Sequence, residues 1–407
     1  MPWQTREEWS ERWRFIDARL TRKFTLKQLC EQFGISRDCA CKWWRRFKSE
    51  GAAGLTDRSR VRRSALQLRA LWLRRVADAR RRYPTWGAPK LRWLLEQNHR
   101  ERPCPSERTI GRWLAEASLT KPQARRAPPG PTLRRPTRRL ARHPNDVWTV
   151  DFKGWFMTAD GKRVSPLTVR DLATRHLLLV RHVRADQHQV ARVMRKLFGR
   201  YGLPREIRSD NGPPFGSLGP RGWAPLTLGW AQLGIRVSFG RPACPQDNAG
   251  HEQMHAVLKN EATRPAAPTL VQQQRRQEAW RRLYNERRPH EAIGMVPPAT
   301  LYRPSPRPLP KRPPPWIYPA GCELKRLDAK GRLTWAQRPR AIGRTFAGQT
   351  VGLKPHRRGI VKVYLGPYLL GTLHASDLTD LRPVRLRSLP REGGGLRPPA
   401  PPPNSSS

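Results

Sequence analysis

The sequence has few acidic residues and no long hydrophobic stretch. Against 80 lysines and arginines stand 31 aspartates and glutamates, so the 407 residues carry a formal net charge of +49. Such a balance favours a polyanionic partner, most simply nucleic acid, although a GC-rich genome also enriches arginine. No apolar run reaches the roughly 18 residues of a membrane span, and no charged-then-apolar leader opens the chain. We therefore expect neither a membrane helix nor a secretory signal.

Paired cysteines are also missing. The six cysteines are scattered, and none forms a C-x-x-C pair with histidine partners. We therefore predict neither a zinc site nor a disulfide. The length of the chain predicts several domains.

Two aspartates occupy unusual places in predicted strands. The β-branched and aromatic run 147–152 contains Asp151, although aspartate is depleted in strands. Asp210 lies where a short predicted strand, 206–210, meets an Asn-Gly turn, a favoured place for site residues in open α/β sheets. Each has a local explanation, an ion pair for Asp151 and a turn cap for Asp210.

A third carboxylate lies on a predicted helix, 248–261. Glu252 shares one face of this helix with Asn248, His255 and Lys259, at steps of three and four residues. Taken alone, this face is typical of a solvated helix surface. One arrangement explains all three carboxylates together, in which they converge and hold divalent metal ions.

Three segments carry a family resemblance: W-T-V-D-F-K-G (148–154), S-D-N-G-P-P-F (209–215) and P-Q-D-N-A-G-H-E-Q-M-H (245–255). They resemble the signatures of DDE transposases, in the subgroup of bacterial insertion-sequence transposases whose catalytic core resembles retroviral integrases. Asp151, Asp210 and Glu252 fall on the first Asp, the second Asp and the Glu of that family. Gln253 stands where the family carries Arg. The Gly/Pro-rich stretch 216–226, a predicted loop, accounts for a longer spacing from Asp210 to Glu252.

The resemblance implies metal-dependent DNA cleavage and strand transfer. Asp151 would bridge two Mg²⁺ ions, Asp210 and Glu252 would hold one each, and Mn²⁺ would substitute. The implied partners are double-stranded DNA, as terminal inverted repeats of the element and as target, and further copies of the chain in a dimer or larger homo-oligomer. The implied location is the bacterial cytoplasm, at the nucleoid. The alternative is a catalytically inactive, domesticated transposase acting as a sequence-specific DNA-binding protein; a nuclease of the same fold is a weaker third.

The amino-terminal part predicts two helix-turn-helix DNA-binding domains, 1–63 and 64–121. In the first, helix 24–33, the turn Gly34-Ile35-Ser36 and helix 37–47 have the helix-turn-helix order, which an ordinary helical hairpin shares. In the second, helices are expected at 65–82, 91–97 and 105–114, the last capped by Ser106. The expected DNA contacts are basic or polar side chains: Arg37, Lys42, Arg45, Arg46 and Lys48 in the first domain, and Lys153, His255 and Lys259 in the core.

The remaining chain divides by composition. Residues 122–144 are a basic Pro-rich linker, 304–316 a Pro-rich linker and 386–407 a disordered tail. Residues 145–303 predict three antiparallel strands followed by alternating helices and strands, which fits a ribonuclease-H-like core with a trailing helix. Short β-like runs in 317–385 suggest a small β-barrel. The predicted fold class is therefore multidomain α+β, with helix-turn-helix units, a ribonuclease-H-like α/β catalytic core and a C-terminal small β-barrel.

Overall fold

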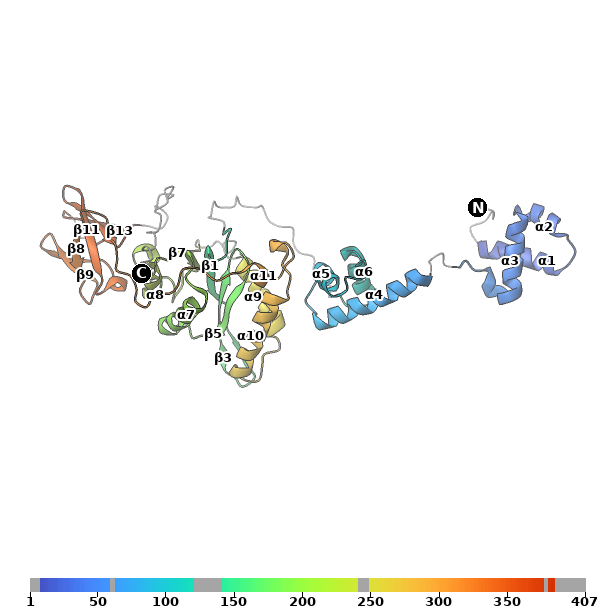
Figure 1. Ribbon diagram of the computed structural model, residues 1–407, viewed down its shortest axis with the longest axis horizontal. Helices are drawn as coiled ribbons and strands as arrows, with labels where there is room; N and C mark the ends of the chain where they lie inside the picture. Colours follow the sequence, from blue (N-terminus) through green and yellow to red (C-terminus); the bar gives the residue numbers. More distant parts are fainter. Residues whose placement is uncertain (1–7, 59–62, 121–140, 241–248, 377–379, 385–407) are drawn as a thin grey trace, which may run out of the picture. The chain divides into compact units, whose positions relative to one another are not determined.

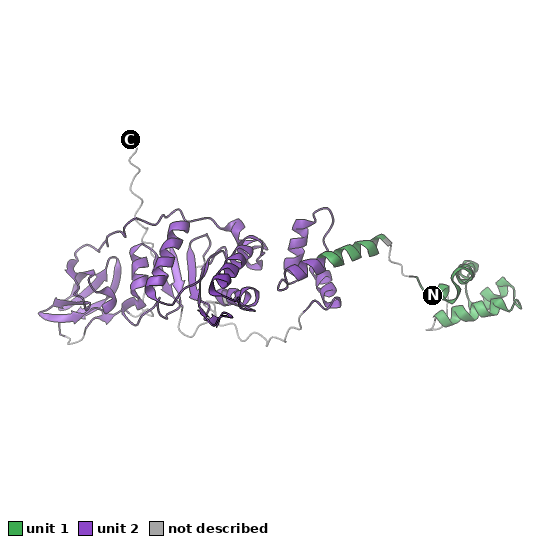
Figure 2. Cartoon of the chain, turned by 90° about the horizontal axis from the view of Figure 1, so that it is seen from below, with its two compact units in different colours: residues 1–75 green, residues 76–407 purple. Residues whose placement is uncertain are grey.

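The computed structural model describes residues 8–58, 63–120, 141–240, 249–376 and 380–384. The chain divides into two compact units, residues 1–75 and 76–407 (Figure 2). Most of the predicted linker 122–144 and all of the predicted tail 386–407 lie outside the described residues. No helix within the described ranges is both long enough and apolar enough to cross a bilayer.

The first unit contains the predicted helix-turn-helix. Helices α1 (Glu8–Leu20), α2 (Leu26–Phe33) and α3 (Arg37–Glu50) are followed by the 3-10 turn η1 (Gly51–Leu55). Gly34 ends α2 in the left-handed conformation, with φ of 62°, and the Ser36 side chain caps α3 by accepting from the Cys39 N–H. The helices enclose a small core of buried apolar residues: Phe15, Ile16, Leu29, Ala40, Trp43 and Leu55.

The second predicted domain also consists of helices where they were expected. They are α4 (Arg63–Arg82), which crosses the boundary of the two units, α5 (Ala88–Asn98) and α6 (Glu107–Glu116). Ser106 caps α6 as predicted, accepting from the Thr109 N–H. Leu91 and Ile110 are fully buried and Trp86 nearly so.

The core of the second unit is a five-stranded sheet in the order β5-β4-β1-β6-β7 (Figure 1). Strand β1 (Val147–Phe152) pairs in antiparallel with β4 (Pro166–Asp171), which pairs in antiparallel with β5 (Leu177–His182). On its other side β1 pairs in parallel with β6 (Glu206–Ser209), and β6 with β7 (Arg236–Phe239). A short hairpin, β2 (Phe156–Met157) and β3 (Arg163–Val164), lies between β1 and β4. Three antiparallel strands followed by alternating helices and strands is the predicted order, and the structure adds that β6 and β7 are parallel to β1.

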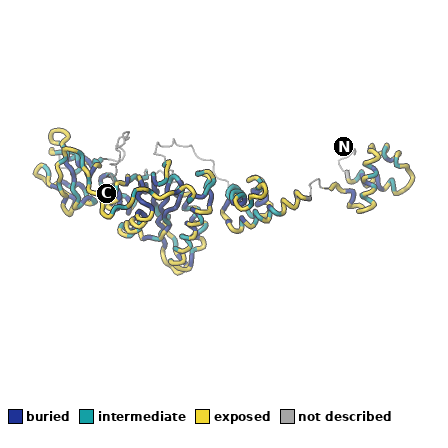
Figure 3. Tube along the Cα trace, viewed as in Figure 1, coloured by how far each residue is buried: buried dark blue, intermediate teal, exposed yellow. Residues whose placement is uncertain are grey.

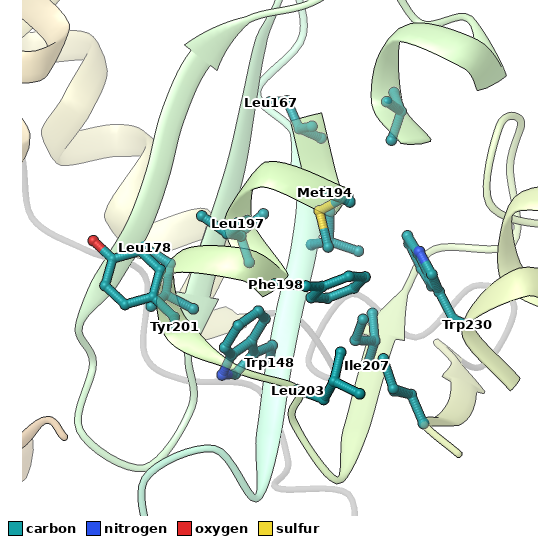
Figure 4. Packing of buried hydrophobic residues seen from close by; sticks show 14 of the residues in the cluster. Trp148, Leu167, Leu178, Met194, Leu197, Phe198, Tyr201, Leu203, Ile207 and Trp230 are labelled. Carbon is teal, nitrogen blue, oxygen red and sulfur yellow. The ribbon is translucent and has the colours of Figure 1, made fainter. Parts of the chain in front are cut away.

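The two faces of this sheet differ. On one face, helices α7 (Gln187–Tyr201) and α8 (Pro225–Gln232) pack against alternate strand residues (Figure 4). That core includes Trp148, Val150, Ile207, Phe198 and Trp230. The opposite face carries the intervening polar residues of β1 and β4, and is described with the site below.

Two further helices pack on the β5 side of the sheet. Helices α9 (Ala249–Ala262) and α10 (Leu270–Glu286) bury a second apolar cluster with β5, made by Leu177, Val180, Met254, Leu258, Ala262, Trp280 and Tyr284. The turn η4 (Glu291–Ile293) and the short helix α11 (Pro298–Leu301) follow. The predicted trailing helix is therefore α10.

The carboxy-terminal part is a small β domain. Its five-stranded sheet has the order β14-β13-β12-β11-β8, with strands β8 (Glu323–Arg326), β11 (Thr350–Arg357), β12 (Ile360–Leu365), β13 (Tyr368–His374) and β14 (Arg382–Pro383). The hairpin β9 (Arg332–Trp335) and β10 (Arg338–Ala341) forms a separate two-stranded sheet, and together with the turn η5 (Arg344–Phe346) it packs into the same apolar core. No described pairing joins β14 to β8, so the sheet is open and closure into a barrel stays a prediction.

The predicted loop 216–226 is not a bare loop. It contains the turn η2 (Pro220–Gly222) and the start of α8, and Trp223 is 2% exposed. The Trp223 ring meets Tyr368 edge-on, with 5.0 Å between centroids, and belongs to the apolar core of the β domain. Figure 3 shows buried stretches of chain, in dark blue, in both the core and the carboxy-terminal β domain.

Candidate active site and DNA-binding surfaces

Asp151 and Asp210 lie at adjoining positions in the sheet. Strand β1 pairs with β6 in parallel, with Thr149 opposite Arg208. Continuing this register by two residues sets Asp210, directly after β6, level with Asp151. Neighbouring strands are about 4.8 Å apart, so the two backbones are close enough for one small site.

Helix α9 is attached to the same region by threonine and histidine side chains. The Thr168 hydroxyl on β4 lies 2.7 Å from Nε2 of His251 and 2.8 Å from Nε2 of His255. Thr149 Oγ1 lies 2.9 Å from Nδ1 of His251. Thr168 is also the register partner of Asp151 and donates to its carbonyl oxygen at 3.0 Å. The first turn of α9, which carries Glu252, is therefore placed against β1 and β4 beside Asp151.

Counting protons fixes the tautomers of both histidines. A threonine hydroxyl has one hydrogen, and the Asp151 carbonyl oxygen can only accept it, so both Nε2 atoms must donate to Thr168. Nδ1 of His251 then has no hydrogen, so the Thr149 hydroxyl donates to it at 2.9 Å in place of its longer hydrogen bond, 3.3 Å, to the Arg170 carbonyl oxygen. Burial, reinforced by the positive charges of Lys153 and Arg170, lowers the pKa of His255 to about 3. Burial also holds the pKa of His251 well below its usual value, so both rings are neutral at pH 7.

A buried cation holds the start of α9. Arg170 on β4 is 2% exposed, and its Nη1 donates to the Gly250 carbonyl oxygen. Burial lowers the pKa of Arg170 to about 10, with the neighbouring Tyr284 opposing the change. Gly250 precedes Glu252 by two residues, so the sheet fixes this turn from two directions.

The three predicted ligands differ in exposure. Asp210 and Glu252 are exposed, and Asp151 is half-buried. Although the Asp210 side chain reaches solvent, partial desolvation of its carboxyl raises its pKa, while backbone hydrogen bonds from Gly212 and from Asp210 itself oppose the rise. Among the described residues, no three His, Cys, Asp or Glu side chains are gathered closely enough to hold a metal ion. The structure thus brings the three backbone positions together without an assembled carboxylate cluster.

Cations surround this end of β1. The pKa of Lys153 is lowered by burial and then by the charges of Lys259 and Arg264. The predicted DNA contacts Lys153, Lys259 and His255 are therefore neighbours, although His255 is neutral and bonded to the sheet. The sequence prediction missed Arg264, Thr168 and His251. The available signal was the spacing of His251 and His255, four residues apart on one face of α9, together with a threonine in each of the strands β1 and β4.

Two nearby carboxylates have structural partners. Asp171 is fully buried and accepts from the Asn145 N–H at 2.7 Å and from the N–H and hydroxyl of Thr174. These bonds give Asp171 a structural role in joining the segments before β1 and after β4. Glu261, at the far end of α9, accepts from Trp280 Nε1 at 2.7 Å and Arg288 Nη1 at 2.5 Å.

The predicted DNA contacts of α3 separate into two kinds. The exposed ones are Arg37, Lys42, Arg45 and Lys48. Arg46 is half-buried, donates to the Thr56 carbonyl oxygen at 3.2 Å and lies 4.7 Å from the centre of the Trp43 ring. Arg12 lies 3.9 Å from the same ring. Arg46 therefore supports the fold of this domain.

Family models match the regions described above. Models described as "Integrase core domain" match residues 141–245 and 233–298. A "Helix-turn-helix domain" model matches residues 11–64, and a "Homeodomain-like domain" model matches residues 39–114.

Relatives come from insertion elements. The "Insertion element IS476 uncharacterized 39.2 kDa protein" of Xanthomonas euvesicatoria is 32% identical over 228 residues, which are 55% of this chain and 62% of that protein. The chain thus spans less than two thirds of that relative. The "Insertion element IS407 uncharacterized 31.7 kDa protein" of Burkholderia multivorans is 30% identical over 227 residues, 55% of this chain and 76% of that protein.

Solved structures with some likeness are viral integrases. The HTLV-2 integrase catalytic core domain in complex with magnesium is 13% identical, with a TM-score of 0.32, covering 40% of this chain and 98% of that one. The simian T-cell lymphotropic virus intasome in complex with PP2A regulatory subunit B56 gamma is 16% identical, with a TM-score of 0.34, covering 58% and 84%. From the domain models and the insertion-element relatives, the chain belongs to the insertion-sequence transposases that have helix-turn-helix domains and an integrase-like core.

Proposed function

We propose that the chain binds the ends of a mobile DNA element and catalyses metal-dependent cleavage and strand transfer with Asp151, Asp210 and Glu252. The observation that carries the proposal is their placement. Asp151 on β1 is level with Asp210, directly after β6, if the parallel register continues by two residues. The hydroxyl of Thr168, the β4 register partner of Asp151, contacts His251 on the helix that carries Glu252. The register and the hydrogen bond support the proposal, because they bring backbone positions far apart in the sequence to one end of the sheet.

The donor set suits Mg²⁺. Carboxylate oxygens are hard ligands, and Mg²⁺ keeps several of its waters, so a few carboxylates suffice. We propose that Asp151, Asp210 and Glu252 would hold such ions. When bound, two such ions activate the attacking oxygen and stabilise the leaving oxygen of a phosphoryl transfer.

The chain's own side chains then position the DNA. Lys153, Lys259 and Arg264 supply positive charge for the phosphates next to the carboxylates. Outside the core, the exposed cations of α3 contact the element ends, and joining two ends requires at least a dimer. We propose the domain limits 1–63, 64–121, 145–303 and 317–385 for these parts, with a small β-barrel as the last.

The test uses a labelled duplex with the inverted repeat that flanks the coding sequence. The full chain should cleave and join it with Mg²⁺ or Mn²⁺, but not with Ca²⁺ or a chelator. Asp151→Asn, Asp210→Asn and Glu252→Gln should each abolish joining and retain binding to the repeat. Joining by any of these variants at the wild-type rate would remove that carboxylate from the site.

A further inference from the structure

An open groove of about 610 Å³ runs along the outer edge of the core sheet. Residues of strand β5 and of helices α7 and α10 line the groove. Figure 1 labels the three elements, with β5 between the two helices. Strand β4 lies between β5 and β1, so the groove is about 10 Å across the sheet from β1. It is therefore a separate place from the carboxylates.

Side chains of α10 already satisfy the backbone of the edge strand. Gln274 accepts from the His182 N–H at 2.9 Å and donates to the Val180 carbonyl oxygen at 3.1 Å. Arg281 donates to the Leu177 carbonyl oxygen at 3.0 Å. An added peptide strand would have to displace these bonds, so side chains determine what the groove binds.

Those side chains are mostly cationic. The exposed cations are Lys196 and Arg200 from α7, Arg181 from β5, and Arg275 and Arg282 from α10. The acid in the groove lining is Glu278, whose pKa is lowered by its hydrogen bond with Arg281 and by further contact with Arg282. Within the described part of the chain, no carboxylate forms an ion pair with Arg181, Lys196 or Arg275.

We propose that this groove binds the phosphodiester backbone of a DNA segment, without reading its sequence. Lys196 and Arg200 lie four residues apart on one side of α7 and face the cations of α10, so positive charge lines both walls. Backbone phosphates are the ligand that such a channel suits. A second copy of the chain is disfavoured, because a twofold interface would bring these like charges together. The inference adds a DNA contact to the helix-turn-helix units and the carboxylate site.

Charge removal with a matched control tests the groove. In the full chain, Lys196→Gln with Arg275→Gln removes one cation from each wall. The control is Arg192→Gln with Arg287→Gln. It removes two exposed cations, one on α7 and one directly after α10, that do not line the groove. Binding to a duplex of random sequence is measured against salt without divalent ions. The groove variant should lower the slope by about 1.8 log units per log unit of salt, because two phosphate contacts are lost, and the control should not. Equal slopes in the two variants would overturn the proposal.

Crosslinking locates the ligand directly. Ala279 is exposed in the groove lining, whereas Val271, 60% exposed on the same helix, is outside it. A photo-reactive residue in place of Ala279 should form a DNA adduct, and one in place of Val271 should not. An adduct between two copies of the chain, or none with DNA, would overturn the proposal. Because neither assay needs cleavage, both results are independent of the metal chemistry.

Discussion

The Thr168 hydroxyl accepts a hydrogen bond from Nε2 of His251 across 2.7 Å, between strand β4 and helix α9. The same hydroxyl also accepts a hydrogen bond from Nε2 of His255, one turn further along the helix, and donates its own hydrogen to the carbonyl oxygen of Asp151. One small side chain thus relates the strand of the first aspartate to the helix of the glutamate. The placement of Glu252 depends on a residue that carries no charge.

Removing that hydroxyl should loosen the helix. Thr168→Val keeps the shape of the side chain but leaves two imidazole N–H groups without an acceptor. An unsatisfied buried donor costs about 1–3 kcal/mol, so the free energy of unfolding in urea should fall by at least that amount. Thr168→Ser retains the oxygen and should recover most of the loss. A Val variant as stable as the wild type would show that the network does not hold α9.

The sequence predicted this region well at the level of elements. Strands β1 and β6, helix α9 and the turn after β6 are local patterns of periodicity, capping and turn residues. The partnership of Thr168 with His251 is not local, since 83 residues separate them. It depends on the strand order and on the register of β1 with β4, neither of which periodicity determines.

Two other differences between the sequence-based expectation and the structure also arise from contacts that are distant in the sequence. The stretch 216–226 has the glycines and prolines of a loop, yet Trp223 is buried against Tyr368 far along the chain. The five cations of α3 are equivalent in sequence, yet Arg46 is bound to Thr56 and Trp43. In both cases the partner is supplied by tertiary packing, which composition does not show.

Arg45 and Arg46 should therefore give different phenotypes. Arg45→Ala removes an exposed cation, so binding to the element ends should weaken and the salt slope should fall by about 0.9 if one phosphate contact is lost. Arg46→Ala should also lower the unfolding temperature, because it removes the hydrogen bond to Thr56 and the contact with Trp43. Salt-dependent binding and thermal unfolding of the two variants check this. If Arg45→Ala is the less stable protein, Arg45 rather than Arg46 supports the fold of this domain.

His176 should make the core sensitive to acid. It is buried and stacked on Tyr302 with 4.4 Å between ring centres, and burial lowers its pKa to about 4, with Arg281 and Arg200 adding to the effect. Between pH 6.5 and pH 4 the unfolded chain, where histidine titrates near 6.5, binds a proton at this residue and the folded chain does not. This contribution is therefore complete above pH 6.5 and is lost as the pH falls towards 4.

The size of that effect can be measured by difference. Between pH 7 and pH 5, His176 should account for about 2 kcal/mol of lost unfolding free energy. The unfolding free energies of the wild type and His176→Gln are measured in urea at both pH values. The variant should be less stable than the wild type at pH 7, but its unfolding free energy should fall by about 2 kcal/mol less between pH 7 and pH 5. The other histidines are present in both proteins and cancel. Identical losses in the two proteins would mean that His176 is protonated in the folded state.

The two glutamates of α9 separate chemistry from folding on a single helix. Glu261 is paired with Arg288, and the two side chains are 12% and 8% exposed. Glu261→Gln would leave a buried guanidinium without its counter-charge, a change that costs about 3 kcal/mol or more. It should lower stability in urea and reduce joining only in proportion to the unfolded fraction.

Glu252→Gln should show the reverse. Glu252 is exposed in the first turn of α9, so its neutral replacement should leave the unfolding free energy unchanged or slightly higher. Joining of the labelled duplex should be lost at every temperature at which the protein is folded. Stability and joining are measured on the same preparations of both variants. If Glu252→Gln unfolds as readily as Glu261→Gln, its loss of joining reports a damaged helix, and the third metal ligand must be sought elsewhere.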